Sequence, residues 1–503
     1  MTHSATKRAL LGVAALTMVC VPFYGAWRYD EFSRAVAAQE APPDARPGAA
    51  AAVGGTPSGN GARDTAPVVL AYHDIARDSP SRYTVTPEAF DAQLAALSAA
   101  GYRTLSSEEF AAYLRGGPAP GPRSVFLTFD DGTHGLWVHA DRVLARYRMK
   151  AAAFLITRAV GSHRPYYLSW EEIGRMHRSG RWDFQNHTRD LHRRAAVDAS
   201  GRMSSVLAGR LWLPGEERRE TEREYRRRVE EDLDRANDDI TRQGLPAPEL
   251  FAYPFSEADG HISVGPTNRI LRAALASRFT AALTNTSGRP LPAGRRAAAA
   301  REVRRVEITA DTAVGDLMAE VERWTAVLPA ACPSPLTQPG LWRHEGGSGT
   351  TGLGAFTGAG PHPRRRYAAA SYRPESTADW SGYTVDARAG GLRDARNNVR
   401  LTVRDGSLDP VAVGLSHSYV RLLEIRDGRW HEIGRRRLTD AAEHRVRIAV
   451  EDGRTVVVVD GRTQIKRAAR VTGGAATGGI AISVRNGDDG SWPHFTSLAV
   501  RPR

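Results

Sequence analysis

The sequence predicts an α/β part, with a parallel sheet either open or closed into a barrel, followed by an all-β sandwich of the jelly-roll kind. Two patterns support this prediction. Over residues 67–328, short apolar runs rich in β-branched residues alternate with stretches of helical periodicity. Over residues 339–503, short alternating runs are separated by Gly, Asp and Asn turns. A length of 503 residues also exceeds one ordinary core.

The N-terminal residues predict export from the cytoplasm. Lys7 and Arg8 precede an uncharged apolar run from Ala9 to Trp27, and this order is typical of a secretory signal. The run is also long enough to span a bilayer as a helix, so residues 1–30 are expected to be a signal peptide or a membrane anchor. Residues 31–66, rich in Ala, Gly and Pro, are expected to form a flexible linker. The rest of the chain is then extracytoplasmic, either secreted or anchored to the cell membrane.

The elements of the α/β part follow from local patterns. Ser169 precedes a helical pattern that stops at Gly180, which predicts a capped helix. The Pro- and Ser-containing stretch 329–338 predicts a linker to the sandwich. The expected strands lie at 67–73, 124–132, 151–157, 249–255, 280–285 and 302–308, and the expected helices at 90–102, 139–149, 169–180 and 216–243.

The charge balance points to a basic surface and not to a nucleic-acid partner. The chain carries 69 basic and 56 acidic residues, for a net charge of +13. The arginines are scattered among acids, as around residues 301–307, without an unbroken basic tail. This pattern favours a solvated surface, or attraction to an anionic cell envelope, and no nucleic acid is expected as a partner. With only Cys20 and Cys332, the chain has no disulfide framework.

Two adjacent carboxylates follow the predicted strand at 124–132. Asp130, Asp131 and Gly132 end this apolar run, and α/β folds place their active sites at the carboxyl ends of strands. Adjacent residues of an extended chain point to opposite faces, so the two acids are expected to face different neighbours. A simple Asp-Gly turn is the alternative.

Two histidines add the residue types that a metal ion needs. His187 and His192 are five residues apart, a spacing that does not align them on one helical face but suits a strand end and the element after it. Imidazole is a preferred ligand of zinc-type metals. Two histidines and one carboxylate would make a three-ligand site with open positions. Taken alone, the histidines would be surface residues.

Two further segments follow predicted strands. His73 directly follows the first strand, where a general acid or base could line a pocket, although a lone histidine is more often structural. Pro254 lies at the end of the strand at 249–255, where it would shape a turn that aims a backbone N–H at a substrate.

Together these motifs resemble those of the polysaccharide deacetylases (carbohydrate esterase family 4). The segments that carry the likeness are TFDDG, the two histidines and YPF. YHD and the run at 167–192 resemble a narrower group, the exported poly-β-1,6-N-acetylglucosamine N-deacetylases. The resemblance covers roughly residues 67–320. It implies a deformed (β/α) barrel, a hydrolase and release of acetate from an extracellular polysaccharide. The sandwich resembles laminin-G or concanavalin-like modules, which implies glycan binding.

The resemblance also implies roles for individual residues. Asp130 is the expected general base and His73 the expected general acid, while the backbone N–H of Phe255 is expected to hold the oxyanion. The expected ligands of a divalent metal are Asp131, His187 and His192. Zinc is favoured, with nickel, cobalt or iron as alternatives. Tyr253, Pro254 and Trp182 are expected to contact the substrate.

The sequence departs from the family pattern in the third motif. Ser256 stands where glycine is usual, and Pro248–Leu250 contains no arginine where the family often has one that orients the base. The group that orients Asp130 is therefore unassigned. A peptidoglycan or chitin-type deacetylase and a catalytically silent glycan-binding surface protein are the alternative functions.

Overall fold

The computed structural model describes residues 66–77, 79–163, 166–257, 266–345, 352–394, 396–426, 429–487 and 490–503. The predicted signal or anchor at 1–30, and all but the last residue of the predicted linker at 31–66, lie outside these residues. Within the described part of the chain, no helix combines the length and the apolar character needed to cross a membrane.

The first part of the chain forms a nearly closed parallel sheet, which confirms the predicted α/β barrel class. Its strand order is β14-β13-β12-β7-β6-β5-β1-β15, with β4 (Arg103–Thr104) beside β5. The strands on this path are β1 (Val68–Tyr72), β5 (Ser124–Phe129), β6 (Ala151–Leu155), β7 (Trp182–Asn186), β12 (Leu250–Ala252), β13 (Ala281–Thr284), β14 (Glu302–Arg304) and β15 (Val306–Glu307).

The two edges of the sheet meet at the segment that contains Arg305. The predicted strand at 302–308 is in fact two strands: β14 pairs with β13, and β15 pairs with β1 at the other end of the sheet. Arg305 lies between them, and its backbone N–H donates to the carbonyl oxygen of Thr284 at 2.8 Å. A single segment therefore joins the first and last strands of the sheet.

Buried strands separate two apolar layers. Every residue of β1, β5 and β6 is buried, as expected for parallel strands covered on both faces. One face packs inside the barrel, where Phe126 and Phe154 are buried. The other face packs under the helices, where Leu127 and Phe129 are buried.

Helices follow most strands, and several begin at capping residues of the kind expected from the sequence. Ser169 caps α5 in a reciprocal capping box with Glu172, and Thr221 caps α6 in the same way. The segment predicted as a helix at 139–149 begins earlier, with a π-helical turn at Leu136–Ala140 that leads into α4. The helices are α2 (Pro87–Ala99), α3 (Ser107–Leu114), α4 (Asp141–Tyr147), α5 (Trp170–Arg178), α6 (Glu222–Thr241), α7 (Pro266–Ala276), α8 (Arg295–Ala300) and α9 (Val314–Trp324).

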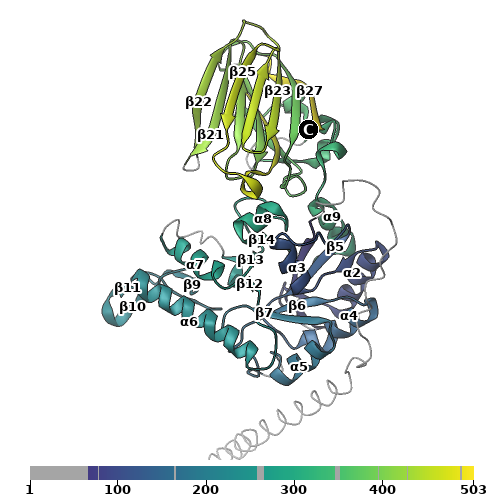
Figure 1. Cartoon of the computed structure of the whole chain (residues 1–503), viewed down its shortest axis with the longest axis vertical. Helices are drawn as coiled ribbons and strands as arrows, with labels where there is room; N and C mark the ends of the chain where they lie inside the picture. The colour runs from purple at the N-terminus through teal and green to yellow at the C-terminus, as the bar shows by residue number, and fades with distance from the viewer. Residues whose placement is uncertain are drawn as a thin grey trace, which may run out of the picture.

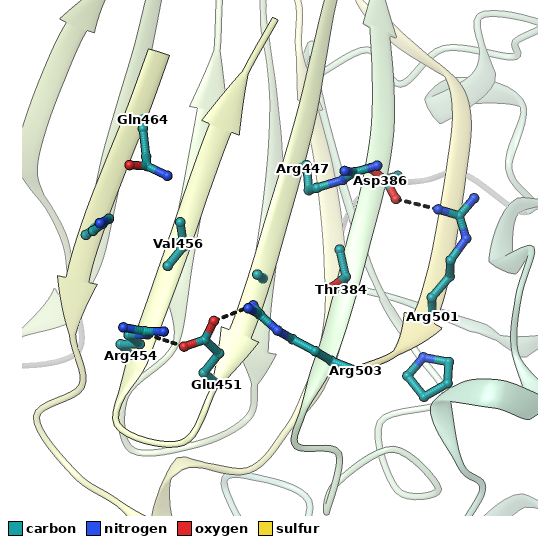
Figure 2. A pocket seen from close by; sticks show the side chains of 12 residues that line it. Thr384, Asp386, Arg447, Glu451, Arg454, Val456, Gln464, Arg501 and Arg503 are labelled. Carbon is teal, nitrogen blue, oxygen red and sulfur yellow. Dashed lines mark hydrogen bonds and ion pairs between the residues drawn. The ribbon is translucent and has the colours of Figure 1, made fainter. Parts of the chain in front are cut away.

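The second part is an antiparallel all-β sandwich, as predicted, and it lies above the barrel in Figure 1. Strands such as β18 alternate buried and less buried residues, which leaves one face for the core between the sheets. One sheet contains β16 (Trp342–His344), β17 (Tyr367–Tyr372), β26 (Gly479–Arg485), β19 (Asn398–Asp405), β20 (Val411–Leu415), β21 (Tyr419–Arg426) and β22 (Arg429–Arg437). The other contains β25 (Thr463–Ala468), β24 (Arg454–Val459), β23 (His444–Glu451), β18 (Tyr383–Gly390) and β27 (His494–Pro502), and Figure 2 shows its outer face.

Helix α8 joins the two parts. The Asp379 carboxylate of the sandwich accepts hydrogen bonds from the backbone N–H groups of Arg295 at 2.8 Å and Arg296 at 2.9 Å. The buried Arg296 guanidinium donates in return to the carbonyl oxygens of Asp405 and Thr477. The sandwich therefore caps a barrel helix, and the helix satisfies carbonyl groups of the sandwich.

We expect Asp379→Ala to lower the melting temperature of the full chain. The substitution leaves two backbone N–H groups at the start of α8 without their acceptor, which costs about 1–3 kcal/mol. Asp440→Ala, at an exposed position of the sandwich, is the control. Equal melting temperatures of the two variants in a thermal unfolding experiment would contradict this account of the junction.

Candidate active site

The candidate site lies at the carboxyl ends of the barrel strands. His73 directly follows β1, Asp130 and Asp131 follow β5, and His187 follows β7. Phe255 lies in the turn after β12. Because parallel strands all end at the same rim of a barrel, residues far apart in sequence meet there. The structure thus brings together both acids and the histidines predicted from the sequence.

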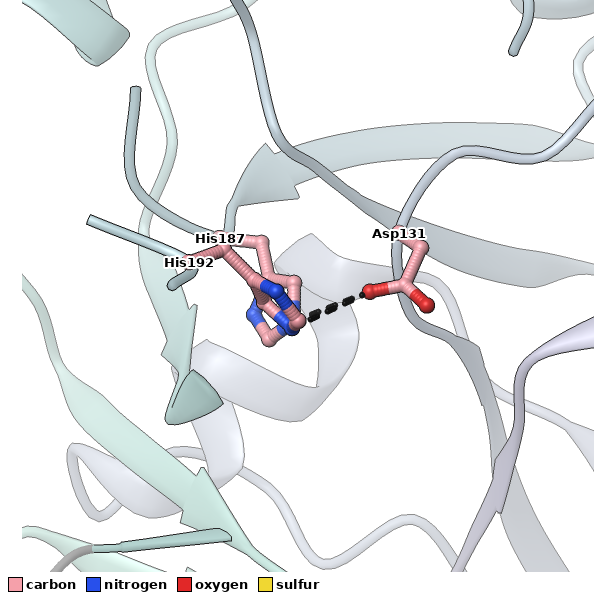
Figure 3. A group of neighbouring side chains, drawn as sticks. All are labelled: Asp131, His187 and His192. Carbon is pink, nitrogen blue, oxygen red and sulfur yellow. Dashed lines mark ion pairs between the residues drawn. The ribbon is translucent and has the colours of Figure 1, made fainter. Parts of the chain in front are cut away.

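Asp131, His187 and His192 form a compact three-residue cluster. The Nε2 atoms of both histidines lie 3.4 Å from Asp131 Oδ1, and one potential ligand atom of each residue lies within 4.8 Å of the others. Figure 3 shows both rings directed at the carboxylate. Tetrahedral zinc with ligand bonds of about 2.0–2.2 Å places neighbouring ligand atoms about 3.3–3.6 Å apart. The cluster therefore fits a divalent metal ion.

The surroundings of the cluster also suit metal binding. His187 Nδ1 lies 2.8 Å from the carbonyl oxygen of Ala252. A proton on Nδ1 would be donated there, which leaves the Nε2 lone pair facing the cluster. Burial, and then the neighbouring His187, lower the pKa of His192 to about 4, so its imidazole is neutral at pH 7. Asp131 Oδ1 is buried and has no hydrogen-bond partner among the described residues.

Asp130 faces away from this cluster and pairs with Arg305 inside the barrel. Arg305 donates to both carboxylate oxygens of Asp130, at 2.8 and 2.6 Å. Asp130 is 3% exposed and Arg305 is 1% exposed. This two-point hydrogen bond fixes the plane of the carboxylate, because a guanidinium fork matches a carboxylate in geometry. The adjacent acids thus face different neighbours.

Other polar groups hold Arg305 in place. Its Nε donates to Asn285 Oδ1 at 2.9 Å, and one terminal nitrogen donates to Thr128 Oγ1 at 3.2 Å. Asn285 in turn donates to Glu307 at 2.8 Å. Such a chain of satisfied partners is what a buried charge requires.

Arg305 is the partner of Asp130 that could not be assigned from the sequence. The arginines around residues 301–307 were predicted to lie on the surface. This prediction is wrong for Arg305, whose side chain is buried inside the barrel. An arginine in the middle of the predicted strand at 302–308 was the available signal. Its partner is set by barrel closure, which no local pattern reveals.

The ion pair determines the charge of Asp130. Burial disfavours a carboxylate, but the charge and hydrogen bonds of Arg305 outweigh burial, with smaller contributions from His187 and His73. Together they hold the pKa of Asp130 well below its usual range. Asp130 is therefore ionised and able to accept a proton at neutral pH.

His73 is a second neighbour of the Asp130 carboxylate. Its Nε2 is 3.9 Å from Asp130 Oδ2, and its ring lies 4.8 Å from that of Tyr83. The side chain is 17% exposed, so part of it is accessible to solvent. His73 therefore lies beside Asp130, and its role as general acid stays a prediction.

Phe255 occupies a strained turn beside the histidines. Its φ of 58° lies in the left-handed region, as does that of Ser256 at 57°, and non-glycine residues with such values often mark functional turns. The Phe255 ring lies 4.6 Å from that of His192, and Arg194 covers it at 4.6 Å. Tyr253, which precedes this turn, and Pro254, its first residue, are both buried, and their predicted contact with substrate stays a prediction.

Trp182 does not lie at the site, and its predicted role in substrate binding is wrong. It is the first residue of β7, whereas the site gathers at the opposite end of that strand. The side chain is 1% exposed and its Nε1 donates to Asp141 at 2.9 Å. It packs in the layer between the sheet and the helices.

Comparison with known proteins finds similarity to a known family in the first part of the chain. Residues 117–264 match the family model described as polysaccharide deacetylase. This similarity to the polysaccharide deacetylases is confined to the first part of the chain. The matched segment contains Asp130, Asp131, His187 and His192, whereas His73 and Arg305 fall outside it.

Curated relatives carry the name poly-β-1,6-N-acetyl-D-glucosamine N-deacetylase. The relative from Staphylococcus epidermidis is 33% identical over 142 residues, which cover 25% of this chain and 49% of the relative. A relative from Staphylococcus aureus is 27% identical over 176 residues, covering 34% of this chain and 54% of the relative. The chain thus spans about half the length of the curated relatives it matches. The solved structure of IcaB from Ammonifex degensii is 27% identical with a TM-score of 0.40, and the match covers 52% of this chain and 98% of that one.

We expect Asp131→Asn to reduce the amount of zinc that the full chain retains after dialysis. The substitution replaces a charged ligand by a neutral amide at the centre of the cluster, which weakens binding of a divalent cation. Metal content per chain, measured by mass spectrometry, provides the readout. Asp190→Asn, which changes an exposed acid nearby, is the matched control, and equal zinc content in both variants would rule out the cluster as the binding site.

Proposed function

We propose that this protein hydrolyses the acetamide groups of an N-acetylglucosamine polysaccharide and releases acetate. One observation carries the proposal. The cluster that fits a metal ion contains Asp131, and the buried, ionised carboxylate belongs to the adjacent residue Asp130. Both lie at one rim of the barrel. Such a pair of functions is what metal-assisted hydrolysis needs.

Asp131, His187 and His192 would hold the metal ion. When bound, a divalent ion supplies Lewis-acid chemistry, which polarises a carbonyl group and lowers the pKa of water. We favour zinc because of the two imidazole ligands, with nickel, cobalt and iron as the alternatives.

The proton transfers are assigned to two side chains. Asp130 accepts a proton from water as the water attacks the acetamide carbonyl, and Arg305 keeps the carboxylate charged and oriented for this step. His73 Nε2 donates a proton to the leaving amine. Hydrogen bonding from the Phe255 backbone N–H would stabilise the negative charge that develops on the carbonyl oxygen.

The favoured substrate is poly-β-1,6-N-acetylglucosamine. The names of the relatives from both staphylococci support this choice, as does the resemblance over residues 167–192. Because such a polymer lies outside the cell, the basic start and apolar run of residues 1–30 support an exported location. We propose a catalytic domain over residues 67–328, a linker at 329–338 and a sandwich over 339–503.

Metal-dependent acetate release from poly-β-1,6-N-acetylglucosamine is the decisive measurement. We expect release by the full chain to stop after chelation and to return on metal addition. Asp130→Asn should lower the rate by about 100-fold or more, because an amide cannot accept the proton. Chitin and peptidoglycan, tested in parallel, rank the alternative substrates. Failure to release acetate from any of the three polymers, with metal bound and the chain folded, would refute the proposal.

Arg305 is proposed to act as a positioning residue. Arg305→Lys keeps the charge but loses the two-point hydrogen bond, so we expect kcat to fall about 10- to 100-fold. Arg305→Met removes the charge as well. The pKa of Asp130 then rises because burial is no longer offset, and the acid limb of the pH–rate profile moves to higher pH.

The metal content of the Arg305 variants distinguishes a positioning role of Arg305 from a folding defect. Both Arg305 variants should retain the metal of the unmodified protein, since Arg305 does not contact the three ligands. An unchanged pH–rate profile in a folded, metal-loaded Arg305→Met protein would contradict the assigned role.

A further inference from the structure

A trough crosses the outer face of the five-stranded sheet of the sandwich (Figure 2). Its volume is about 530 Å³. It is formed by side chains that point away from the core of the sandwich on all five strands, and the mechanism proposed above uses none of them.

The strand register explains the floor of the trough. Val456 on β24 pairs with Lys466 on one side and Ala449 on the other, Ala449 pairs with Thr384, and Thr384 pairs with Arg501. One row across the sheet therefore contains three small uncharged residues between two cationic ends. With about 4.8 Å between strands, this row is about 19 Å long. Such a floor suits an extended chain lying across the strands.

The rows on either side form charged walls. Asp386 accepts hydrogen bonds from Arg447 at 2.6 Å and from Arg501 at 3.0 Å. On the other wall, Glu451 forms ion pairs with both Arg454 and Arg503. Figure 2 shows each carboxylate bracketed by its two guanidinium groups.

The cations outnumber the acids. Five basic residues line the trough against Asp386 and Glu451, an excess of three positive charges. The basic side chains are the accessible ones: Arg447 is 60% and Arg501 is 63% exposed, whereas Asp386 is 19% exposed. A ligand in the trough therefore meets guanidinium groups first.

The side-chain chemistry selects an anion. The lining contains no Trp, Tyr or Phe, the side chains on which neutral sugar rings would stack. Guanidinium groups match carboxylates in a two-point geometry, and the trough already shows this preference, because each of its own carboxylates is held between two arginines. Its modest charge excess, distributed over the two ends of the floor and the two walls, suits a chain with single charges at intervals.

We propose that this trough binds a linear polysaccharide that carries carboxylate groups. Such a ligand is distinct from the proposed substrate, whose N-acetylglucosamine units are uncharged. The trough would hold the enzyme on an anionic polymer while the barrel acts on another glycan. This proposal does not depend on the deacetylase activity.

Binding of the full chain to polygalacturonate, measured by calorimetry, tests the proposal. Replacing Arg447, Lys466 and Arg501 by Gln should raise Kd at least tenfold. Replacing Arg429, Arg436 and Arg437 by Gln on β22 removes the same charge from the other sheet and should change Kd less than twofold. Equal losses in the two triple variants would overturn the proposal, because binding would then follow overall charge alone.

A second variant fills the trough without changing its charge. Thr384→Tyr places a large side chain on the floor and should also weaken binding about tenfold or more, with the melting temperature unchanged. Retained affinity in this variant would contradict binding within the trough.

Dextran, a neutral polymer, and polyphosphate, a different anion, are the control ligands. Binding to dextran as strong as to polygalacturonate, or binding to polyphosphate alone, would overturn the carboxylate assignment. Asp130→Asn should bind like the unmodified protein, which separates this test from that of catalysis.

Discussion

The ion pair between Asp130 and Arg305 is the constraint on which the candidate site depends. Both side chains are buried, and a buried charge is tolerated only when it is paired and hydrogen-bonded. The pair forms because β14 and β15 leave Arg305 at the seam where the sheet closes. The ionised state of the proposed base, Asp130, therefore depends on closure of the barrel, because closure places Arg305 against it.

At the barrel rim, the two adjacent carboxylates face different groups. Asp130 continues the inward-facing positions of β5, as Phe126 and Thr128 do, whereas Asp131 adopts a left-handed backbone conformation with φ of 73° and faces the histidines. Phe255 adopts a similar conformation, and its ring lies against that of His192. At these two residues, a strained backbone directs the chain at the site.

The two parts of the chain use charge in different ways. In the barrel, a few buried charges are each matched by a specific partner, as Arg305 is by Asp130 and Asn285. On the five-stranded sheet of the sandwich, arginines outnumber their carboxylate partners and remain exposed. Buried charges fix geometry, while exposed ones create a field that attracts oppositely charged ligands. The net charge of +13 therefore describes neither part by itself.

The sequence alone determined the fold classes, most strands and the residues at the ends of β5 and β7, because apolar periodicity and strand-end chemistry are local properties. Asp130, Asp131, His187 and His192 were found in this way. Only the tertiary structure decided that Arg305 meets Asp130, that the segment at 302–308 is shared between two edges, and that Trp182 packs in the core. These facts depend on which strands become neighbours when the sheet closes, and pairing across more than a hundred residues leaves no mark on local sequence.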